Sequence, residues 1–415
     1  MSGPTTEGAT PGGAGPDGAA ATPPVRLRRV GRVPAAALDA AGWSWLYDEG
    51  AADYLGDDVV VVTEDEAEAL YLAGAELYDM VVAAADHVVE ADRLGEMGIP
   101  DVAHDLVRQT WEDERQWHVW GRFDLAGGVG GVPIKLIEFN ADTATLLPES
   151  SLLQWAQVSR ADPDAVQYNA LYERLVEQFG RLKGKNPDLV YDGRASLLAT
   201  DAAGLREDHA NLSVLTAAAE EAGFSVTVRP VHEVHFAAGE GVFTFEEGAG
   251  WTRHDFVVKL VPWEMVIEDE PEIFETLAGL ILDRHVVVAN PPYALLLQSK
   301  RLLKVLWERF EGHPLLLPAA YAPIETGRFV EKVAFGREGA NVTVYDALGN
   351  ETLRTPGDYD VYPSVFQAWA DLPHDARVDL YQTGLVWAFE PCAIGFRKGG
   401  EVIGNASPFV GHVVE

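Results

Sequence analysis

The sequence contains a single cysteine among its 415 residues, and no apolar run long enough to cross a bilayer. One thiol excludes an internal disulfide framework and any cysteine-rich metal site. Cys392 lies in the apolar stretch "AFEPCAIGF", so we expect a buried, unreactive thiol rather than a nucleophile. A membrane-spanning helix needs about 20 predominantly apolar residues, and the sequence therefore predicts no membrane span.

Basic residues are scarce relative to acidic ones. The chain has 31 Lys and Arg against 65 Asp and Glu, which gives a formal net charge of −34 at pH 7. Such a charge repels nucleic-acid phosphates and anionic membranes, and it attracts cationic ligands. An acidic surface also serves plain solubility, so the charge alone leaves both interpretations open. A chain of this composition that binds ATP must concentrate its few cations at one place.

The first 24 residues, "MSGPTTEGATPGGAGPDGAAATPP", contain almost no bulky apolar side chain. They lack the basic start and the apolar centre of a secretion signal. Their composition predicts a disordered tail over residues 1–24, followed by one folded region over residues 25–415. Together with the missing membrane span, this pattern favours a cytoplasmic protein.

The spacing of apolar residues predicts a mixed α+β fold. Helical periodicity indicates helices over residues 34–48, 64–91, 171–184, 209–223 and 297–310. Strands over residues 194–200 and 224–231 flank one of these helices, which is typical of an α/β passage. A hairpin is predicted around the glycine-rich turn of "HVWGRFDLAGGVGGVPIKLIEFNAD", and the C-terminal part is rich in strands.

The second strand of this hairpin, in "IKLIEFNADTATLLPES", begins with apolar residues and ends in oxygen-bearing side chains. Because side chains alternate between the two faces of a strand, Glu138 and Asn140 point the same way. Arg122 and Asp124 do so on the preceding strand. A carboxylate beside a neutral amide oxygen suits Mg²⁺. The same residues at a strand end also fit solvent contact or the capping of a turn, so this stretch alone leaves both interpretations open.

Several cations lie at places that a nucleotide would use: Lys300 at or near the start of a helix, Lys332 before a glycine-containing loop, and Arg397 beside another glycine-containing turn. Lys332 ends a strand, and the small loop 336–341 follows it. A glycine-containing loop lets backbone N–H groups surround a phosphate, while lysines supply positive charge. The loop matches neither GxxxxGK[ST] nor GxGxxG, so by itself it also fits an ordinary hairpin turn. Combined with the metal-type donors, it indicates binding of ATP and Mg²⁺.

Several stretches resemble, in order, the ATP-grasp synthetase domain of the glutathionylspermidine synthase family: "RFDL", "IEFNADTAT", "LLLQSK", "VEKVAFGREGANV", "QAWADLP" and "AIGFRKGGEVIGNASPFVGHVV". The resemblance covers roughly residues 27–415. It implies an ATP-grasp fold with a preceding pre-ATP-grasp-like α/β region. It also implies an ATP- and Mg²⁺-dependent ligase that joins a peptide or amino acid carboxylate to a polyamine or other amine through an acyl phosphate. It favours a homodimer.

The resemblance also implies roles for individual residues. It implies Mg²⁺ ligands at Asp124, Glu138 and Asn140, and contacts to the carboxyl substrate at Arg122, Thr143 and Thr145. It implies nucleotide contacts at Lys300, Lys332, Arg337, Glu338, Gly339, Gln367, Trp369 and Gln382. Arg397 matches a catalytic arginine that stabilises the transferring phosphoryl group, and Arg122 is the second catalytic candidate. Glu207 and Asp208 are candidates for holding the ammonium groups of the amine, although a solvated helix start explains them equally well.

This sequence departs from the family pattern in two respects. Members carry Ser where this chain has Thr143 and Thr145, which keeps the hydroxyl but adds a methyl group to the peptide pocket. Bifunctional members carry an amidase domain with a cysteine nucleophile ahead of the synthetase, whereas Cys392 lies near the other end of this chain. We therefore expect no amidase activity.

Two other functions compete with the ligase. One is a nucleotide-binding regulator or scaffold that keeps the fold without turnover, and the other is a kinase that stops at phosphoryl transfer. ADP formation in the presence of amines distinguishes the ligase from the regulator. Trapping with hydroxylamine distinguishes it from the kinase, because only an activated carboxylate yields a hydroxamate.

Overall fold

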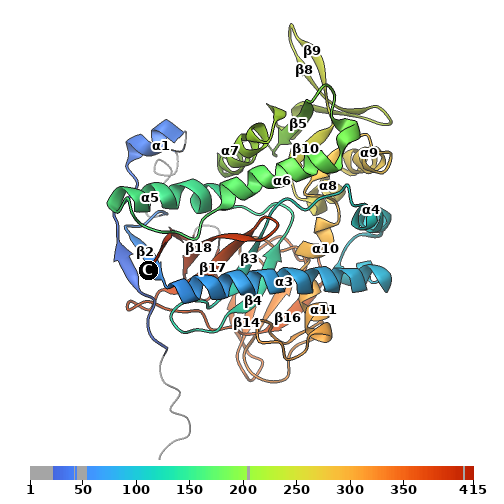
Figure 1. The fold of residues 1–415 in the computed structure, drawn as a ribbon. Helices are drawn as coiled ribbons and strands as arrows, with labels where there is room; N and C mark the ends of the chain where they lie inside the picture. The colour runs from blue at the N-terminus through green and yellow to red at the C-terminus, as the bar shows by residue number, and fades with distance from the viewer. Residues whose placement is uncertain (1–21, 42, 44–53, 203–205, 405–406) are drawn as a thin grey trace, which may run out of the picture.

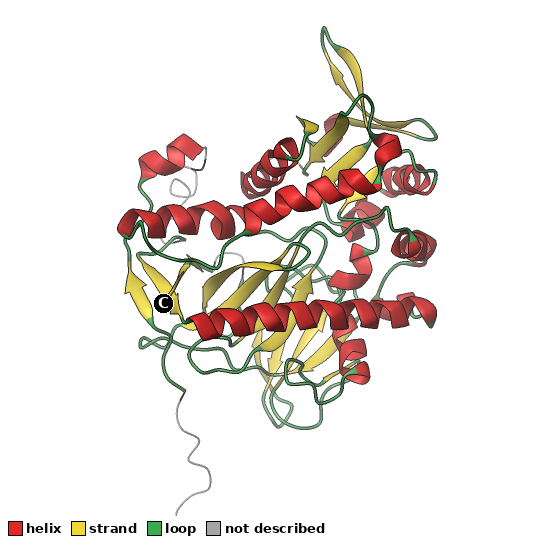
Figure 2. Ribbon diagram, in the orientation of Figure 1, coloured by secondary structure: helices red, strands yellow, loops and turns green. Residues whose placement is uncertain are grey.

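The computed structural model describes residues 22–41, 43, 54–202, 206–404 and 407–415. The predicted tail lies outside these residues, apart from positions 22–24. The predicted helix over residues 34–48 is described only in its first part, as α1 (Ala35–Ala41). The rest of the described chain is a mixed α/β structure with three larger and two smaller sheets, in which long helices run past the strands (Figures 1 and 2).

One antiparallel sheet contains the predicted hairpin. Its strands, in spatial order, are β19 (Phe409–Val410), β18 (Pro391–Gly399), β17 (Leu380–Trp387), β3 (Gly121–Ala126) and β4 (Lys135–Asn140). Arg122 pairs with Asn140, and Asp124 pairs with Glu138, so the two side chains predicted to share a face on each strand lie on the same face of the sheet. Gly127 begins the turn with a φ of 77°, and a Cβ atom there would lie 2.1 Å from the Pro133 carbonyl oxygen. Only glycine fits at this position.

A second antiparallel sheet confirms the predicted strand–loop–strand around Lys332. Its order is β12 (Ala319–Ala320), β16 (Ser364–Ala368), β13 (Phe329–Val333), β14 (Thr343–Tyr345) and β15 (Glu351–Arg354). The Lys332 ammonium group donates to the Ile137 carbonyl oxygen of the first sheet at 3.0 Å. Gln367 Nε2 donates to the Leu136 carbonyl oxygen at 2.9 Å. These two bonds fix the second sheet against β4.

The predicted α/β passage forms a parallel sheet. Its order is β11 (Val287–Ala289), β10 (Phe256–Lys259), β5 (Ala195–Thr200) and β6 (Phe224–Val228). Helix α7 (Arg206–Glu221) connects β5 to β6. A three-stranded meander of β7 (Val234–Ala237), β8 (Gly241–Glu246) and β9 (Gly250–His254) projects at the top of Figure 1. This meander was not among the predicted elements.

Most predicted helices are confirmed, and the one over residues 297–310 is confirmed in its C-terminal part but interrupted near its start. The chain forms α10 (Ala294–Gln298) and α11 (Leu302–Arg309) instead. The break occurs because the Lys300 N–H donates to the Ala334 carbonyl oxygen, and the Ser299 hydroxyl donates to the Met97 carbonyl oxygen. The other helices of the described residues are α3 (Glu64–Glu90), α4 (Asp101–Glu112), α5 (Gln154–Ala161), α6 (Leu171–Lys185), α8 (Trp263–Asp269) and α9 (Pro271–Leu282), with short segments η2 (Leu94–Met97), η3 (Glu149–Leu153), η4 (Pro187–Leu189) and η5 (Val231–Glu233).

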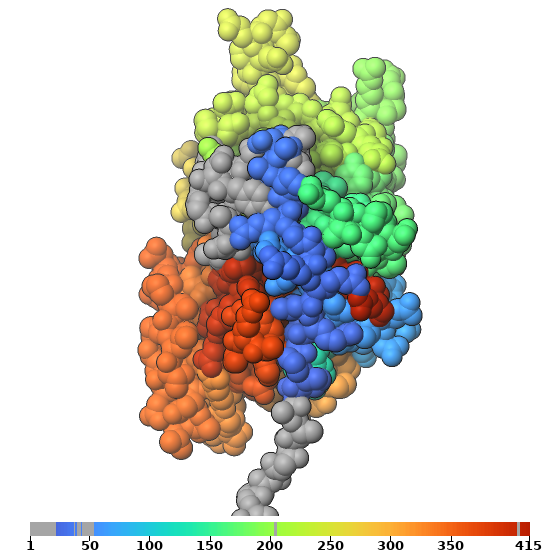
Figure 3. All heavy atoms as spheres, turned by 90° about the vertical axis from the view of Figure 1, so that its left-hand side faces the viewer, coloured from blue at the N-terminus to red at the C-terminus, as the bar shows by residue number. Residues whose placement is uncertain are grey.

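The last described strand lies beside one of the first. β20 (His412–Val414) pairs in parallel with β2 (Asp58–Val62), and β1 (Leu27–Arg29) pairs with the other edge of β2. Figure 3 shows the blue N-terminal segment and the dark red C-terminal segment adjacent on one side of the molecule. Helix α3 packs against β17 and β18 and contributes buried residues to the largest apolar core. None of the described helices combines the length and the apolar character that a bilayer crossing requires.

Candidate functional site

A cavity of about 830 Å³ opens between the two antiparallel sheets. Its walls include strands β3, β4, β17 and β18 on one side and β13 and β16 on the other, with the first turn of α7 at one end. The volume is in the range of small-molecule sites, about 300–1,000 Å³. All of the site residues predicted from sequence line it: Arg122, Asp124, Glu138, Asn140, Thr143, Thr145, Glu207, Asp208, Lys300, Lys332, Arg337, Glu338, Gly339, Gln367, Trp369, Gln382 and Arg397. Their individual roles stay predictions.

The predicted metal ligands are in mutual contact. Asn140 Nδ2 lies 3.2 Å from Asp124 Oδ2 and 3.4 Å from Glu138 Oε1, so the amide group bridges two carboxylates. Arg122 donates two hydrogen bonds to Asp124, at 2.6 and 3.1 Å, and the Lys300 ammonium group lies 3.3 Å from Glu138. Burial raises the pKa of Glu138, but the neighbouring cations outweigh it and hold the pKa below its ordinary value. Glu138 is therefore ionised at neutral pH.

This donor set fits a hard divalent cation. Two carboxylates and an amide oxygen are donors of the kind that Mg²⁺ prefers, and Mg²⁺ usually keeps further positions for phosphates and water. The Asn140 amide, whose Nδ2 faces the carboxylates in this structure, would turn to present its oxygen. Within the part of the chain that the structure describes, no group of three or more His, Cys, Asp or Glu side chains is placed to hold a metal ion. A cation at this site therefore depends on the amide of Asn140 in addition to the two carboxylates.

Lys332 points from the second sheet toward these carboxylates. Its side chain is buried, and its ammonium group donates to Gln367 Oε1 at 2.8 Å. Burial lowers the pKa of Lys332 to about 8, although Glu138 and Asp124 partly oppose the change. Both ends of the Gln367 amide contact protein groups, since Nε2 donates to β4. In this structure Gln367 therefore holds the lysine in place.

The loop 336–341 covers the cavity. Lys300 donates to the Gly336 carbonyl oxygen at 2.7 Å, and Thr355 Oγ1 donates to the Gly339 carbonyl oxygen at 2.6 Å. Glu338 and Gly339 adopt left-handed backbone conformations, with φ of 56° and 71°. A Cβ atom on Gly339 would lie 2.8 Å from the Ile403 carbonyl oxygen, so the loop packs closely against the segment 402–404.

Arg397 and Gln382 are paired across β18 and β17 and face the cavity together. Arg397 Nη1 donates to the carbonyl oxygens of Gly404 and Ser407 at 3.2 Å each, and its Nη2 lies 3.4 Å from the Tyr54 hydroxyl. The Arg122 Nη1 group donates to the Thr145 carbonyl oxygen at 3.1 Å. On the opposite wall, the Arg328 guanidinium carbon lies 3.9 Å above the ring of Trp369.

The acidic end of the cavity is the first turn of α7, where Glu207 and Asp208 both line the wall. Burial, together with the negative charges of Glu207 and Asp201, raises the pKa of Asp208 to about 6. A carboxyl group of this kind gains from a nearby cation, which restores its ionised form. The geometry is compatible with the predicted binding of an ammonium group.

Sequence reasoning missed several polar residues at the site. Glu264 and Gln298 line the cavity, and a buried Lys259 pairs with Asp142 just behind it, at 2.8 and 2.9 Å. Lysine is almost never fully buried unless it is paired, so the lysine inside the apolar strand "DFVVKLV" was a usable signal. Glu264 gave no such signal, because helical spacing alone does not show which charged residue faces a cavity. Cys392 is buried as expected, and burial raises its pKa.

Comparison with known proteins supports the resemblance. A protein of Haemophilus influenzae named as a candidate acid–amine ligase is 28% identical over 347 residues, which are 79% of this chain and 82% of that protein. Trypanothione synthetase of Crithidia fasciculata is 24% identical over 317 residues, 71% of this chain and 47% of its own length. The bifunctional glutathionylspermidine synthetase/amidase of Escherichia coli is 24% identical over 338 residues, 75% of this chain and 52% of its own. The chain thus spans about half the length of the last two.

A solved structure shows the same fold. The glutathione synthetase-like effector from Globodera pallida superposes with a TM-score of 0.54 at 8% identity, over 86% of this chain and 89% of the effector chain. Residues 30–415 match the family described as glutathionylspermidine synthase preATP-grasp. This range includes every residue that lines the cavity. The predicted resemblance is confirmed, and the chain belongs to the glutathionylspermidine synthase preATP-grasp family.

Proposed function

We propose that this chain is an ATP- and Mg²⁺-dependent carboxylate–amine ligase with an ATP-grasp fold. The observation that carries the proposal is the arrangement inside one cavity, where Asp124, Glu138 and Asn140 on one sheet oppose Lys332 on another. Relatives named as an acid–amine ligase and as trypanothione synthetase support the same reaction class. The acid is a peptide or amino acid, and the amine is a polyamine or another amine.

Residues from both antiparallel sheets would take part in binding the nucleotide. Lys300 and Lys332 supply point charges for the phosphates, and the loop 336–341 excludes water above them. Asp124, Glu138 and Asn140 would hold Mg²⁺, which neutralises charge on the phosphates when bound. Water exclusion matters, because water competes with the amine for an activated carboxylate.

The reaction has two balanced steps. A carboxylate oxygen of the acid takes the γ-phosphoryl group, the bond to the β-phosphate breaks, and ADP leaves. The amine nitrogen then attacks the carbonyl carbon of the acyl phosphate, inorganic phosphate leaves, and the nitrogen loses a proton. Arg122 and Arg397 would stabilise the negative charge in both steps. Thr143 and Thr145 would contact the carboxyl substrate, and Glu207 with Asp208 would hold a distal ammonium group.

The test is to incubate the purified chain with ATP, Mg²⁺ and a metabolite extract, and to follow ADP release and new amides by mass spectrometry. Hydroxylamine in place of the amine should give a hydroxamate, because it captures an activated carboxylate. The variant Glu138→Gln serves as the inactive control. Nucleotide binding without ADP release would support a regulator or scaffold instead, and a phosphorylated product without hydroxamate would support a kinase.

A further inference from the structure

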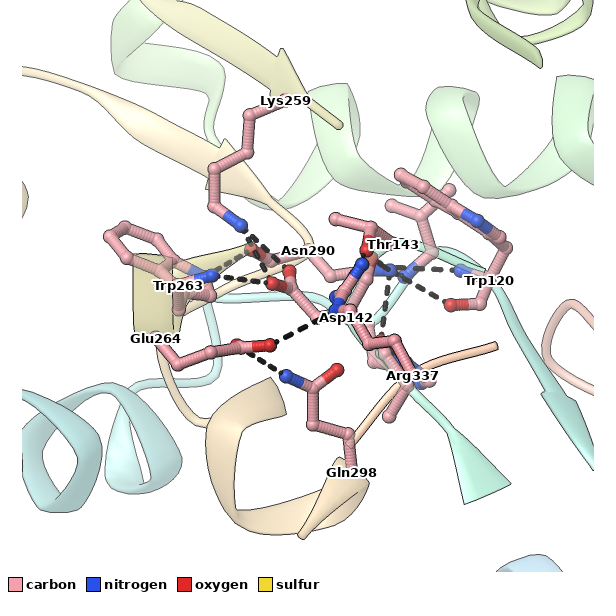
Figure 4. Close-up of polar contacts among 12 residues, drawn as sticks. Trp120, Asp142, Thr143, Lys259, Trp263, Glu264, Asn290, Gln298 and Arg337 are labelled. Carbon is pink, nitrogen blue, oxygen red and sulfur yellow. Dashed lines mark hydrogen bonds and ion pairs between the residues drawn. The ribbon is translucent and has the colours of Figure 1, made fainter. Parts of the chain in front are cut away.

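Arg337 connects the loop over the cavity to two other parts of the chain. Its Nε group lies 3.2 Å from Glu264 Oε1 on helix α8, and its Nη2 group donates to the Thr143 hydroxyl at 2.9 Å. Thr143 follows strand β4, whereas Arg337 lies between β13 and β14. Figure 4 shows the guanidinium group between Thr143 and Glu264, so one loop side chain is tied across the cavity.

Glu264 is the fixed member of this contact. Its side chain is 3% exposed, against 29% for the side chain of Arg337. Its second carboxylate oxygen accepts a hydrogen bond from Gln298 Nε2 at 2.7 Å, at the end of α10. A buried carboxylate requires hydrogen-bonding and charged partners, and these two side chains provide them. Glu264 is therefore held on both oxygens, while Arg337 is the more exposed partner and belongs to the loop.

A guanidinium group that is bound at two points has a defined orientation. The contacts with Glu264 and Thr143 use the Nε and Nη2 groups, and no described residue hydrogen-bonds to Nη1. A planar fork of N–H groups recognises carboxylate or phosphate oxygens in a fixed direction. Because Thr143 is a predicted contact of the carboxyl substrate, the oriented guanidinium lies beside the place where that carboxyl group would bind.

We propose that Glu264 is a positioning residue, which holds Arg337 beside Thr143 and thereby keeps the loop 336–341 closed over the acid-binding end of the cavity. The acid-binding part rests on the proposed ligase function, whereas the loop contact does not. Removing the charge of Glu264 should release Arg337 and loosen the loop. The KM for the acid should then rise. Nucleotide affinity should fall less, because Lys300 and Lys332 would still bind the phosphates even where the predicted nucleotide contacts of the loop itself are loosened.

Hydrogen exchange of the full-length chain tests the contact without any substrate. In Glu264→Gln the amides of residues 336–341 should exchange roughly tenfold or more faster than in the wild type, because the closed loop is destabilised locally. Asp269→Asn is the matched control, since Asp269 is an exposed carboxylate on the same helix α8. Its loop should exchange as in the wild type.

Arg337→Ala provides a second variant, because a partly exposed loop side chain can be removed without damage to the core. It should accelerate exchange of the same loop even if Glu264→Gln folds poorly. Unchanged loop exchange in Arg337→Ala, or in a folded Glu264→Gln, overturns the proposal whether or not ligase activity is found. Faster loop exchange in a chain that shows no ligase activity supports the contact and contradicts the proposed function instead.

Kinetics test the substrate end of the proposal. Glu264→Gln should raise the KM for the acid roughly tenfold, equivalent to the loss of one charge-assisted contact, with a smaller effect on kcat. The affinity for a non-hydrolysable ATP analogue, measured by calorimetry, should stay within about twofold. A drop in kcat and nucleotide affinity with an unchanged KM for the acid would overturn the positioning role.

Discussion

At the scale of single residues, the neutral amide of Asn140 lies between the carboxylates of Asp124 and Glu138. A carboxylate in its place would add a third negative charge and repel both. The Asn140 amide group contacts both Asp124 and Glu138, and Arg122 and Lys300 neutralise their outer oxygens. The negative charge at the site is thus kept low enough to be stable without a cation, yet two anionic donors remain. This balance suits a site that binds Mg²⁺ together with a nucleotide rather than permanently.

Replacing either donor should remove turnover and leave the fold intact. We expect Asn140→Ala and Glu138→Gln each to lower kcat/KM by roughly 100-fold or more, because charge on the transferring group loses its stabilisation. The measurement is ADP release as a function of Mg²⁺ concentration, with circular dichroism as the fold control. Asn350→Ala, in an exposed turn, is the matched control. Normal activity of either variant at limiting Mg²⁺ would show that the replaced residue is not a metal ligand.

The two lysines should contribute to nucleotide binding more than to stability. Burial has already shifted the pKa of Lys332 down to about 8, so its charge is not well stabilised by the protein alone. We expect Lys332→Met and Lys300→Met to weaken ATP binding roughly tenfold or more while the melting temperature changes little. Calorimetry checks this, with Lys304→Met as the control outside the cavity. Unchanged affinity would mean that neither lysine contacts the phosphates.

Asp208 predicts a pH dependence of amine binding. Its pKa is raised from 3.8 to about 6. Its contribution to folding stability is therefore present below about pH 4 and is lost as the pH rises through about 6. Above that pH the carboxylate is ionised and should bind a cationic amine, so spermidine affinity should increase between about pH 5 and about pH 7. Calorimetry in the presence of ATP analogue measures this.

The variant Asp208→Asn should bind spermidine weakly and without this pH dependence. Glu220→Gln, at the far end of the same helix, should behave like the wild type, because it lies outside the cavity. If the spermidine affinity of the wild type did not change across this pH range, Asp208 would be a solvated residue at the helix start and would not bind the amine.

At the scale of secondary-structure elements, one buried ion pair joins the parallel sheet to the end of the hairpin. Lys259 ends β10, Asp142 follows β4, and Asp142 also accepts a hydrogen bond from the Trp263 N–H at 2.8 Å (Figure 4). Asp142 is fully buried, and the Lys259 ammonium group lies 4.4 Å from the centre of the Trp263 ring. This contact positions the segment that carries Thr143.

Breaking the pair should destabilise the protein. Lys259→Met leaves an uncompensated buried carboxylate and should lower the free energy of unfolding by about 3–5 kcal/mol. Urea denaturation measures the change, and the double variant Lys259→Met with Asp142→Asn should recover part of it, because no buried charge is left alone. A single variant within about 1 kcal/mol of the wild type would show that the pair adds little.

The spacing of apolar residues predicted those helices and strands that can be recognised from their own residues alone. The hairpin of β3 and β4 followed from alternation and a glycine turn, and its shared face followed from the period of two. The break at Lys300 did not follow, because the bond that causes it goes to Ala334, which is distant in sequence and lies in the turn after β13. Glu264 was missed for the same reason, since its partner Arg337 is distant in sequence. Lys259 gave a usable signal as a lysine in an apolar strand, but its partner Asp142 could not be predicted because it is also distant in sequence.

At the scale of the whole molecule, the net charge of −34 favours a cationic second substrate. Attraction by the whole charge distribution mainly raises the encounter rate, and it fades with salt because the Debye length is about 10 Å at 0.1 M. We expect kcat/KM for spermidine to fall as salt increases, while kcat/KM for ammonia or a neutral amino acid changes little. Salt should not lower kcat/KM for the acid, because negative charges on it are repelled.

A salt series with spermidine, putrescine, lysine and ammonia makes the comparison, with the same acid throughout. If ammonia or a neutral amino acid proved the best acceptor, and salt had no effect, the polyamine would be the wrong substrate. The acidic surface would then serve solubility, and the ligase assignment would be unaffected.

The pairing of β3 with β17 has a consequence for biosynthesis. β3 carries Arg122 and Asp124, yet the strand that completes its second edge begins at Leu380. A nascent chain on the ribosome therefore holds an unpaired edge of β3 until the strand that begins at Leu380 has emerged. Such an edge invites pairing with other chains, so truncated translation products should be chaperone clients and aggregate readily. The sheet that forms one wall of the cavity can be completed only after β17 has been synthesised.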